Sequence, residues 1–179
     1  STSIRGDSTT DVLTLKRMPE ISIDLPRSKS GYSVKAEDTF WIKQGILRAS
    51  DLRDSFDEQC VADIVATIVD DYKPIDRDKD VLDSLYQPGS PESEKINKII
   101  AIYGPEKIEQ EFIFCINILN ELCKKEKLRN MIYGGKSSSN PIPSIFSQIF
   151  IAIHEIVFKE GKAISDYALL QTKLESLKD

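Results

Sequence analysis

The stretch Asp38–Asp71 constrains the fold of this chain more than any other part of it. Within this stretch, apolar residues recur at the i, i+3, i+4, i+7 and i+8 spacing that lines one face of an α-helix. These residues are Val61, Ile64, Val65, Ile68 and Val69. Ser55 and Glu58 have the spacing of a capping box, which predicts that the helix starts near Ser55. The pattern therefore predicts an amphipathic helix that packs on a core through this face.

Helical spacing continues through the rest of the chain. Ser90 and Pro91 suit the N-cap and the first position of a helix, and Gly104-Pro105 separates that helix from a longer one. A further cap is expected at Ser165, before the last helix. The segment Ile145–Lys159 is apolar nearly all round, so we expect it to be the central and most buried helix.

Residues 1–37 have a different character. The apolar residues of Ile21–Leu25 alternate with polar ones, which is typical of a strand, but Pro19 and Pro26 limit it to an edge or an isolated strand. The sequence therefore predicts an extended or single-strand N-terminal segment over residues 1–37 and a helical domain over residues 38–179. The expected fold class is mostly α, a multi-helix orthogonal bundle.

Charge and composition exclude several classes of protein. The 179 residues include 24 Lys and Arg against 29 Asp and Glu, for a net charge of −5. Non-specific nucleic-acid binding needs clustered cations, so DNA binding by this piece alone is disfavoured. The longest apolar run, Ile149–Ile153, is too short to span a bilayer. Cys60, Cys115 and Cys123 form no CxxC pair and indicate buried thiols in a reducing, cytoplasmic setting.

No catalytic, cofactor or metal site can be assembled from the sequence. His154 is the single histidine and lies on the most apolar helix, so we expect a packed or hydrogen-bonded core residue. The run Gly134–Ser137 invites a phosphate-loop reading, but Asn130 stands where that motif needs glycine. A helix C-cap followed by a loop is the favoured interpretation of this run.

One dense group of charged residues, which we call the Arg/Asp cluster, stands out as a candidate contact site. Its members are Arg48, Asp51, Arg53, Asp54, Asp57 and Glu58. The two guanidinium groups are able to pair with the carboxylates or to bind phosphate. We favour a structural ion-pair network, because the acidic members outnumber the arginines, and keep contact with a partner or nucleic acid as the alternative.

Short motifs along the chain occur in a familiar order. They are Met18–Ile21, Phe40-Trp41 with Gly45–Arg48, Arg53–Ser55 with Asp57-Glu58, Phe150–Glu155, Gly161-Lys162 and Ile164–Tyr167. This order resembles part of the large bacterial family of ParB/sulfiredoxin-like proteins of the GmrSD type. Some members of that family act as nucleotide-dependent, modification-directed restriction or phage-defence factors.

The chain departs from that family at its hallmark. It contains neither the Asp-Gly-Gln-Gln-Arg loop taken to bind the nucleotide nor a His-Asn-His nuclease segment. The resemblance therefore implies the helical portion of a larger protein, cut away from its catalytic loops. None of the family's functional residues transfers to a position in this sequence.

Three functions follow, in order of preference. The first is a non-catalytic accessory fragment that packs on the remainder of a larger polypeptide and reaches DNA only through the full-length protein. The second is a stand-alone helical module that binds a protein partner through an apolar groove. An enzyme is the least favoured, because no base–nucleophile pair is apparent. The sequence leaves the oligomeric state open, and the full open reading frame would separate the first two readings.

Overall fold

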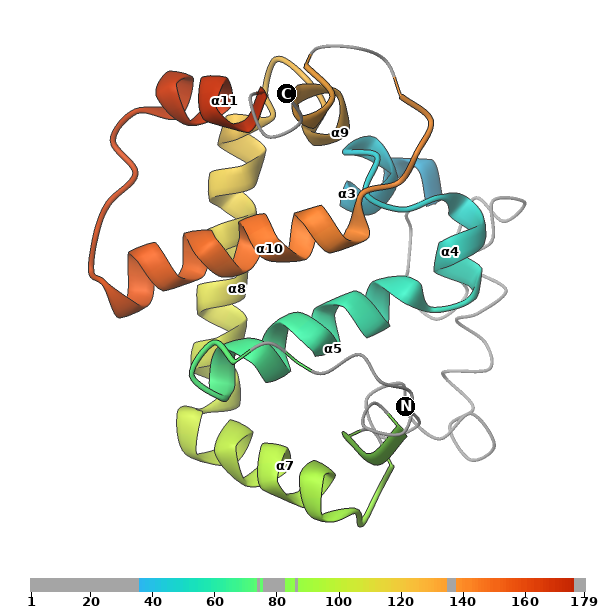
Figure 1. Cartoon of the computed structure of the whole chain (residues 1–179), viewed down its shortest axis with the longest axis vertical. Coiled ribbons are helices and arrows are strands. Elements are labelled where there is room, and N and C mark those ends of the chain that lie inside the picture. Colours follow the sequence, from blue (N-terminus) through green and yellow to red (C-terminus); the bar gives the residue numbers. More distant parts are fainter. Residues whose placement is uncertain (1–35, 74, 76–82, 86, 135–137, 176–179) are drawn as a thin grey trace.

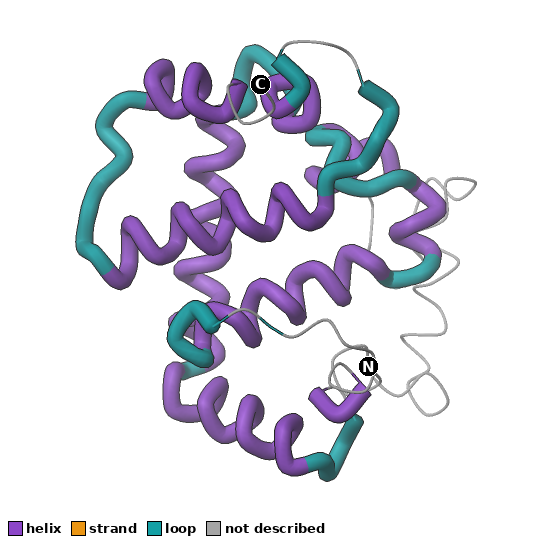
Figure 2. Tube along the Cα trace, in the orientation of Figure 1, coloured by secondary structure: helices purple, strands orange, loops and turns teal. Residues whose placement is uncertain are grey.

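The part of the chain that the computed structural model describes (residues 36–73, 75, 83–85, 87–134 and 138–175) contains helices and no strand. Figures 1 and 2 show the helices and their connections. In chain order the elements are η1 (Ala36–Asp38), α3 (Phe40–Lys43), α4 (Ala49–Arg53), α5 (Phe56–Val69), α7 (Pro91–Tyr103), α8 (Pro105–Leu122), α9 (Leu128–Ile132), α10 (Pro143–His154), η2 (Glu155–Lys159) and α11 (Tyr167–Glu175). The predicted mostly-α class is confirmed. The strand predicted at Ile21–Leu25 lies outside the described residues.

Three helices form the centre of the core. In Figure 1, α10 runs alongside α5 and across α8, and it contacts both. The ring of Phe150 on α10 packs against Phe112 on α8, with 4.4 Å between ring centroids. Phe146, Leu119 and Ile64 are fully buried around this crossing. Each such side chain stabilises the fold by about 1.5–3 kcal/mol through its removal from water.

The N-terminal helices pack where α9 and the start of α10 meet. The indole ring of Trp41 contacts Phe146 with 5.3 Å between ring centroids. The backbone N–H of Arg129 donates to the carbonyl of Gln44 at 3.1 Å. Gly45 follows with φ of +70°, and a Cβ there would lie 2.8 Å from Arg129 Nε. Only glycine allows this close approach without strain.

Helix caps agree with the sequence at one site and differ at two, although α5 starts at Phe56, next to Ser55, as predicted. Ser90 caps α7 as predicted, because its hydroxyl oxygen accepts from the Ser93 N–H at 3.0 Å. The predicted capping box at Ser55 is wrong: its φ is +57° and its side chain caps no N–H. The tight turn between α4 and α5 demands this left-handed conformation, whereas a capping residue is extended. At α11 the cap is Asp166, which accepts from the Leu169 N–H at 2.9 Å, rather than Ser165.

The predicted central helix Ile145–Lys159 is two elements. The α-helix α10 ends at His154, and the π-helix η2 continues to Lys159. The prediction that this segment is the most buried is half right. Phe146, Phe150 and Ile153 are buried on one face, but Ile156 is 39% exposed. The reason is that α5 and α8 cover only part of the circumference of α10.

Candidate functional site

A chain of hydrogen bonds, buried at its centre and partly buried at its two ends, links three helices and one turn. His154, which is 2% exposed, ends α10, and its Nε2 lies 3.1 Å from Oε2 of the buried Glu111 on α8. The Tyr103 hydroxyl on α7 donates to the same carboxylate oxygen at 2.6 Å. The hydroxyl of Tyr72, after α5, lies 2.8 Å from His154 Nδ1. We call Tyr72, His154, Glu111 and Tyr103 the Tyr–His–Glu network.

The hydrogen-bonding partners determine which atoms of this network carry the protons. An ionised carboxylate only accepts hydrogen bonds, so Nε2 of His154 donates to Glu111. Burial lowers the pKa of His154, although the negative charge of Glu111 opposes this shift. A neutral imidazole with hydrogen on Nε2 accepts at Nδ1, so the hydroxyl of Tyr72 donates to it. The prediction that His154 is a hydrogen-bonded core residue is confirmed.

The network has the connectivity of a catalytic triad, with a phenol in place of the nucleophile. Its electrostatics oppose that role. Burial and the charges of Glu155 and Glu111 raise the pKa of Tyr72 to about 12. An activated nucleophile requires the opposite shift. The network therefore serves to hold α7, α8, α10 and the turn after α5 together.

Contacts of a lysine hold Tyr72 in place although the backbone there is strained. Asp71 and Tyr72 have φ of +58° and +60°, which is unfavourable for side chains other than glycine. Lys159 Nζ on η2 lies 3.0 Å from the Asp71 carboxylate and 4.7 Å from the centre of the Tyr72 ring. It also pairs with Glu155 at 3.5 Å. The π-helix thus fastens the turn after α5 to the end of α10.

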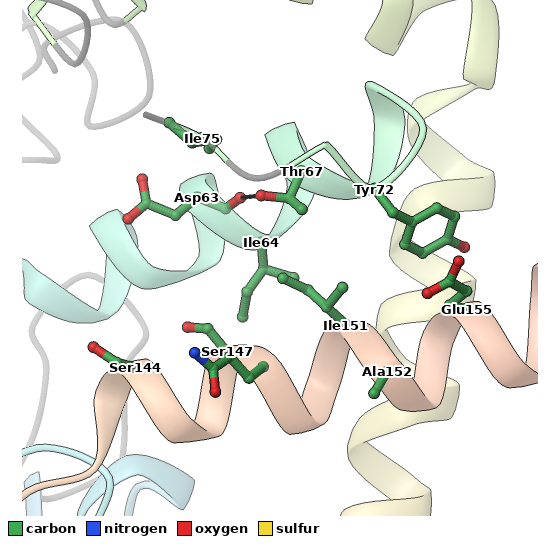
Figure 3. Close-up of a pocket in the computed structure, with 11 residues that line it drawn as sticks. Asp63, Ile64, Thr67, Tyr72, Ile75, Ser144, Ser147, Ile151, Ala152 and Glu155 are labelled. Atoms are coloured by element: carbon green, nitrogen blue, oxygen red, sulfur yellow. Dashed lines mark hydrogen bonds between the residues drawn. The ribbon is translucent and has the colours of Figure 1, made fainter. Parts of the chain in front are cut away.

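A cavity of about 350 Å³, which we call the α5–α10 cavity, lies beside the network. Figure 3 shows it between the two helices, with Tyr72 and Glu155 at one end and Asp63 and Ser144 toward the other. Between these ends the walls are largely apolar, and Ile64 and Ile151 are among the side chains that form them. The size falls in the range of small-molecule sites.

An apolar groove of about 540 Å³, which we call the α10–α11 groove, lies between α10 and α11. In Figure 1, α11 and α5 lie on either side of α10, so the groove and the cavity border different faces of that helix. Aliphatic side chains dominate the groove: Ile149, Ile153, Ile156, Leu169, Leu170 and Leu174. Leu169 is 56% exposed. Exposed apolar patches of this kind mark interaction sites.

The Arg/Asp cluster lies at the two ends of α4 and the start of α5. Oδ2 of Asp51 accepts from the backbone N–H of Arg48 at 2.7 Å and so caps α4. Arg53 is the last residue of α4, and Asp54, which is exposed, is its C-cap. Asp57 and Glu58 occupy the first turn of α5, where negative charge suits the helix dipole. Of the cluster members whose side chains the structure describes, none lines the cavity or the groove, and the role of the cluster stays a prediction.

The cysteines and the possible metal ligands are the remaining groups with relevant chemistry. Cys60, Cys115 and Cys123 are buried thiols that form no disulfide, as predicted, and Sγ of Cys60 lies 3.3 Å from Oγ of Ser147. Burial raises the pKa of Cys115 and of Cys123 to about 12. Over the described ranges no group of three or more His, Cys, Asp or Glu side chains is arranged to hold a metal ion. None of the helices described reaches the length and apolarity needed to cross a membrane.

Comparisons of this chain with protein-family models, curated proteins and solved structures found no match. The cavity, the groove and the network are therefore the features of the molecule from which a function can be inferred.

Sequence reasoning missed the partners of His154. Glu111 lies one turn before Cys115 on the face of α8 that packs inward, and a carboxylate at such a position signals a buried polar contact. Tyr103 follows Ile99 and Ile100 at helical spacing, and this pattern indicates no hydrogen-bond partner for its hydroxyl. Tyr72 begins a highly charged stretch, whose composition is typical of a solvated loop and does not indicate a buried contact.

Proposed function

We propose that the chain is a helical docking unit, non-catalytic on its own, of a larger cytoplasmic restriction-like or phage-defence protein. The observation that carries the proposal is the α10–α11 groove, whose apolar residues Ile156 and Leu169 remain exposed. The resemblance to GmrSD-type proteins supplies the class of parent. The accessory role agrees with a network whose electrostatics disfavour a nucleophile.

The chemistry of the groove defines its occupant. Among the described residues, two ionisable side chains line it, Asp166 and Lys173, and they carry opposite charges. An occupant with an apolar, near-neutral face therefore fits best. A helix that presents apolar residues at i, i+3, i+4 and i+7 is the usual solution for a groove between two helices. We propose that this helix belongs to the remainder of the same polypeptide.

We propose that the remainder of the polypeptide, and not this chain, contacts DNA. The chain carries a net charge of −5, which opposes phosphate binding. In this account the docking unit positions the nucleotide-binding part and reaches DNA only through it.

The alternative is a stand-alone module that binds a helix of a separate protein in the same groove. The apolar lining favours this reading equally. The two readings differ in where the occupant is encoded, and this difference can be tested.

A co-purification experiment tests the proposal. The chain and the remainder of its open reading frame are expressed as two separate polypeptides, and Leu169→Asp is compared with Ile102→Asp. Ile102, at 86% exposure on α7, lies outside the groove and is the matched control. We expect the two pieces to co-purify, with loss only in Leu169→Asp. Equal binding by both variants, or no association of the pieces, would contradict the proposal; a groove that captures an apolar-faced helix of another protein would instead favour the stand-alone module.

A further inference from the structure

The outer side of α8 exposes apolar residues at the middle of the helix. Ile113 and Phe114 are the two central residues of its 18, and they are 51% and 49% exposed. The ring of Phe114 contacts that of Phe158 on η2, with 5.5 Å between ring centroids. Phe158 is itself 37% exposed. We call Ile113, Phe114 and Phe158 the α8 patch. Adjoining exposed apolar side chains of this kind mark interaction sites.

The α8 patch is distinct from the core and from the α10–α11 groove. Cys115, Leu119 and Leu122 are fully buried on one side of α8, and α10 crosses and contacts this helix (Figure 1). At 3.6 residues per turn, Ile113 lies on the side opposite to these three residues. No residue of the patch lines the groove. The patch therefore calls for a partner other than the occupant of the groove.

Opposite charges flank the patch along the same helix. Glu106 is exposed in the first turn of α8, and Lys124 and Lys125 are exposed just after its last turn. Lys124 pairs with Glu121 of its own chain at 2.5 Å, so Lys125 remains as an excess cation. Spacings of 7 and 11 residues place Glu106, Ile113 and Lys124 near one side of the helix, because they correspond to about two and three turns. That side runs from acidic through apolar to basic.

Such a helix is complementary to a reversed copy of itself. In an antiparallel pair, Glu106 of each copy lies beside Lys124 of the other, and the two central patches meet near the two-fold axis. The exposed amides of Gln110 and Asn120 then face each other between the centre and the ends, and amides both donate and accept hydrogen bonds. A parallel pair would instead set Glu106 against Glu106 and Lys124 against Lys124, which is repulsive. The charge pattern therefore selects the antiparallel arrangement.

We propose that the outer side of α8 binds a second copy of this chain in an antiparallel, two-fold symmetric pair. Ile113 and Phe114 of both copies form its apolar centre, Phe158 borders that centre, and the pairs between Glu106 and Lys124 close both ends. The patch is small, so we expect a weak dimer, with a Kd of about 10–100 μM. The proposal concerns a surface other than the groove and does not depend on the docking function.

Sedimentation of the whole chain over a range of concentrations measures the dimer, and a matched pair of variants locates it. Phe114→Gln removes a half-exposed ring from the patch and should weaken the dimer at least about tenfold, because both copies lose the contact. Phe56→Gln is the control, since Phe56 is 51% exposed at the start of α5. We expect its dimer to be as tight as that of the unaltered chain. Circular dichroism checks that both variants are folded.

Charge exchange tests the antiparallel arrangement. Glu106→Lys and Lys124→Glu each set like charges against each other at both ends of the pair, and each should weaken the dimer at least about threefold. The chain that carries both changes should recover the original affinity. An equal mixture of the two single variants should also associate more tightly than either variant alone, because every end then joins opposite charges. These changes are at exposed positions, so they decide the question even if Phe114→Gln fails to fold.

Three results would overturn the proposal. The first is a chain that stays monomeric up to about 1 mM. The second is a dimer that Phe114→Gln and Phe56→Gln affect equally, or that Leu169→Asp in the groove disrupts instead. The third is an affinity that is the same in both single charge variants as in the unaltered chain, since an antiparallel pair of α8 helices cannot be indifferent to those changes.

Discussion

His154 on α10 and Glu111 on α8 lie 3.1 Å apart between Nε2 and Oε2, in a hydrogen bond that joins the two crossing helices. Both residues are buried. The same carboxylate accepts from Tyr103 on α7, and the imidazole accepts from Tyr72 after α5. The His154–Glu111 contact and its two tyrosine partners therefore join α7, α8, α10 and the turn after α5.

Stability should fall in mild acid because of His154. Burial makes its pKa lower in the folded protein than its unfolded value of about 6.5. The unfolded state therefore takes up this proton as the pH falls through about 6.5, before the folded state does, and the free energy of unfolding decreases. We predict that His154→Gln reduces this loss between about pH 7.5 and pH 5.5. Urea denaturation across this range measures it, and parallel profiles for both proteins would contradict the assignment.

Replacing the Glu111 carboxylate by an apolar group should lower the free energy of unfolding more than neutralising its charge does. Glu111→Leu leaves the His154 N–H and the Tyr103 O–H without an acceptor, at a cost of about 2–5 kcal/mol. Glu111→Gln retains an acceptor oxygen and should cost less. Adding Tyr103→Phe to Glu111→Leu should cost less than the sum of the two single changes, because they share one contact. Additive losses in chemical denaturation would show that Tyr103 and Glu111 do not act together.

Two isoleucines on α10 should respond differently to a charge. Ile153 is 4% exposed, so Ile153→Asp buries an unpaired carboxylate and should unfold the domain, whose total stability is about 5–15 kcal/mol. Ile149 is half-buried and lines the groove. A helix buried all round, as the sequence predicts for Ile145–Lys159, would make both changes unfold the domain, but the partial exposure of Ile149 leads us to expect that Ile149→Asp remains folded with reduced stability. Melting followed by circular dichroism decides, and equal behaviour of the two variants would contradict the burial assignment.

We predict that, within the Arg/Asp cluster, the Asp51 carboxylate contributes more to stability than the Arg48 side chain does. Asp51→Ala removes the acceptor for the Arg48 N–H and should cost about 0.5–2 kcal/mol. Arg48→Ala keeps that N–H and should cost about 0–1 kcal/mol. If Arg48 instead contacts phosphate, its loss should flatten the salt dependence of DNA binding by the full-length protein by about one unit. A titration at several salt concentrations distinguishes a structural role from a contact role.

Local signals explain what the sequence predicted well. The helix at α5, the Ser90 cap and the break at Gly104 depend on residues close together in the chain, and the structure has all three. Of the stripe predicted on α5, Ile64, Ile68 and Val69 are buried, whereas Val61 and Val65 are only partly buried. The failed cap at Ser55 depends instead on the path of the chain from α4, which forces a left-handed backbone there.

The candidate site could not be predicted in the same way. Tyr72 and His154 are joined only by the packing of the turn after α5 onto the end of α10, and no short-range pattern encodes that contact. The position of the groove likewise depends on how α11 returns to α10. The single His and the buried-face position of Glu111 were the available hints.

The central claim is that the α10–α11 groove is covered in the parent protein. Hydrogen exchange of the isolated chain, compared with the same residues in the full-length protein, tests it most directly. The account predicts that exchange slows in α11 and η2, around Leu169 and Ile156, and stays unchanged around Ile102 on α7. Exchange in α11 and η2 that is as fast in the full-length protein as in the isolated chain would contradict the account.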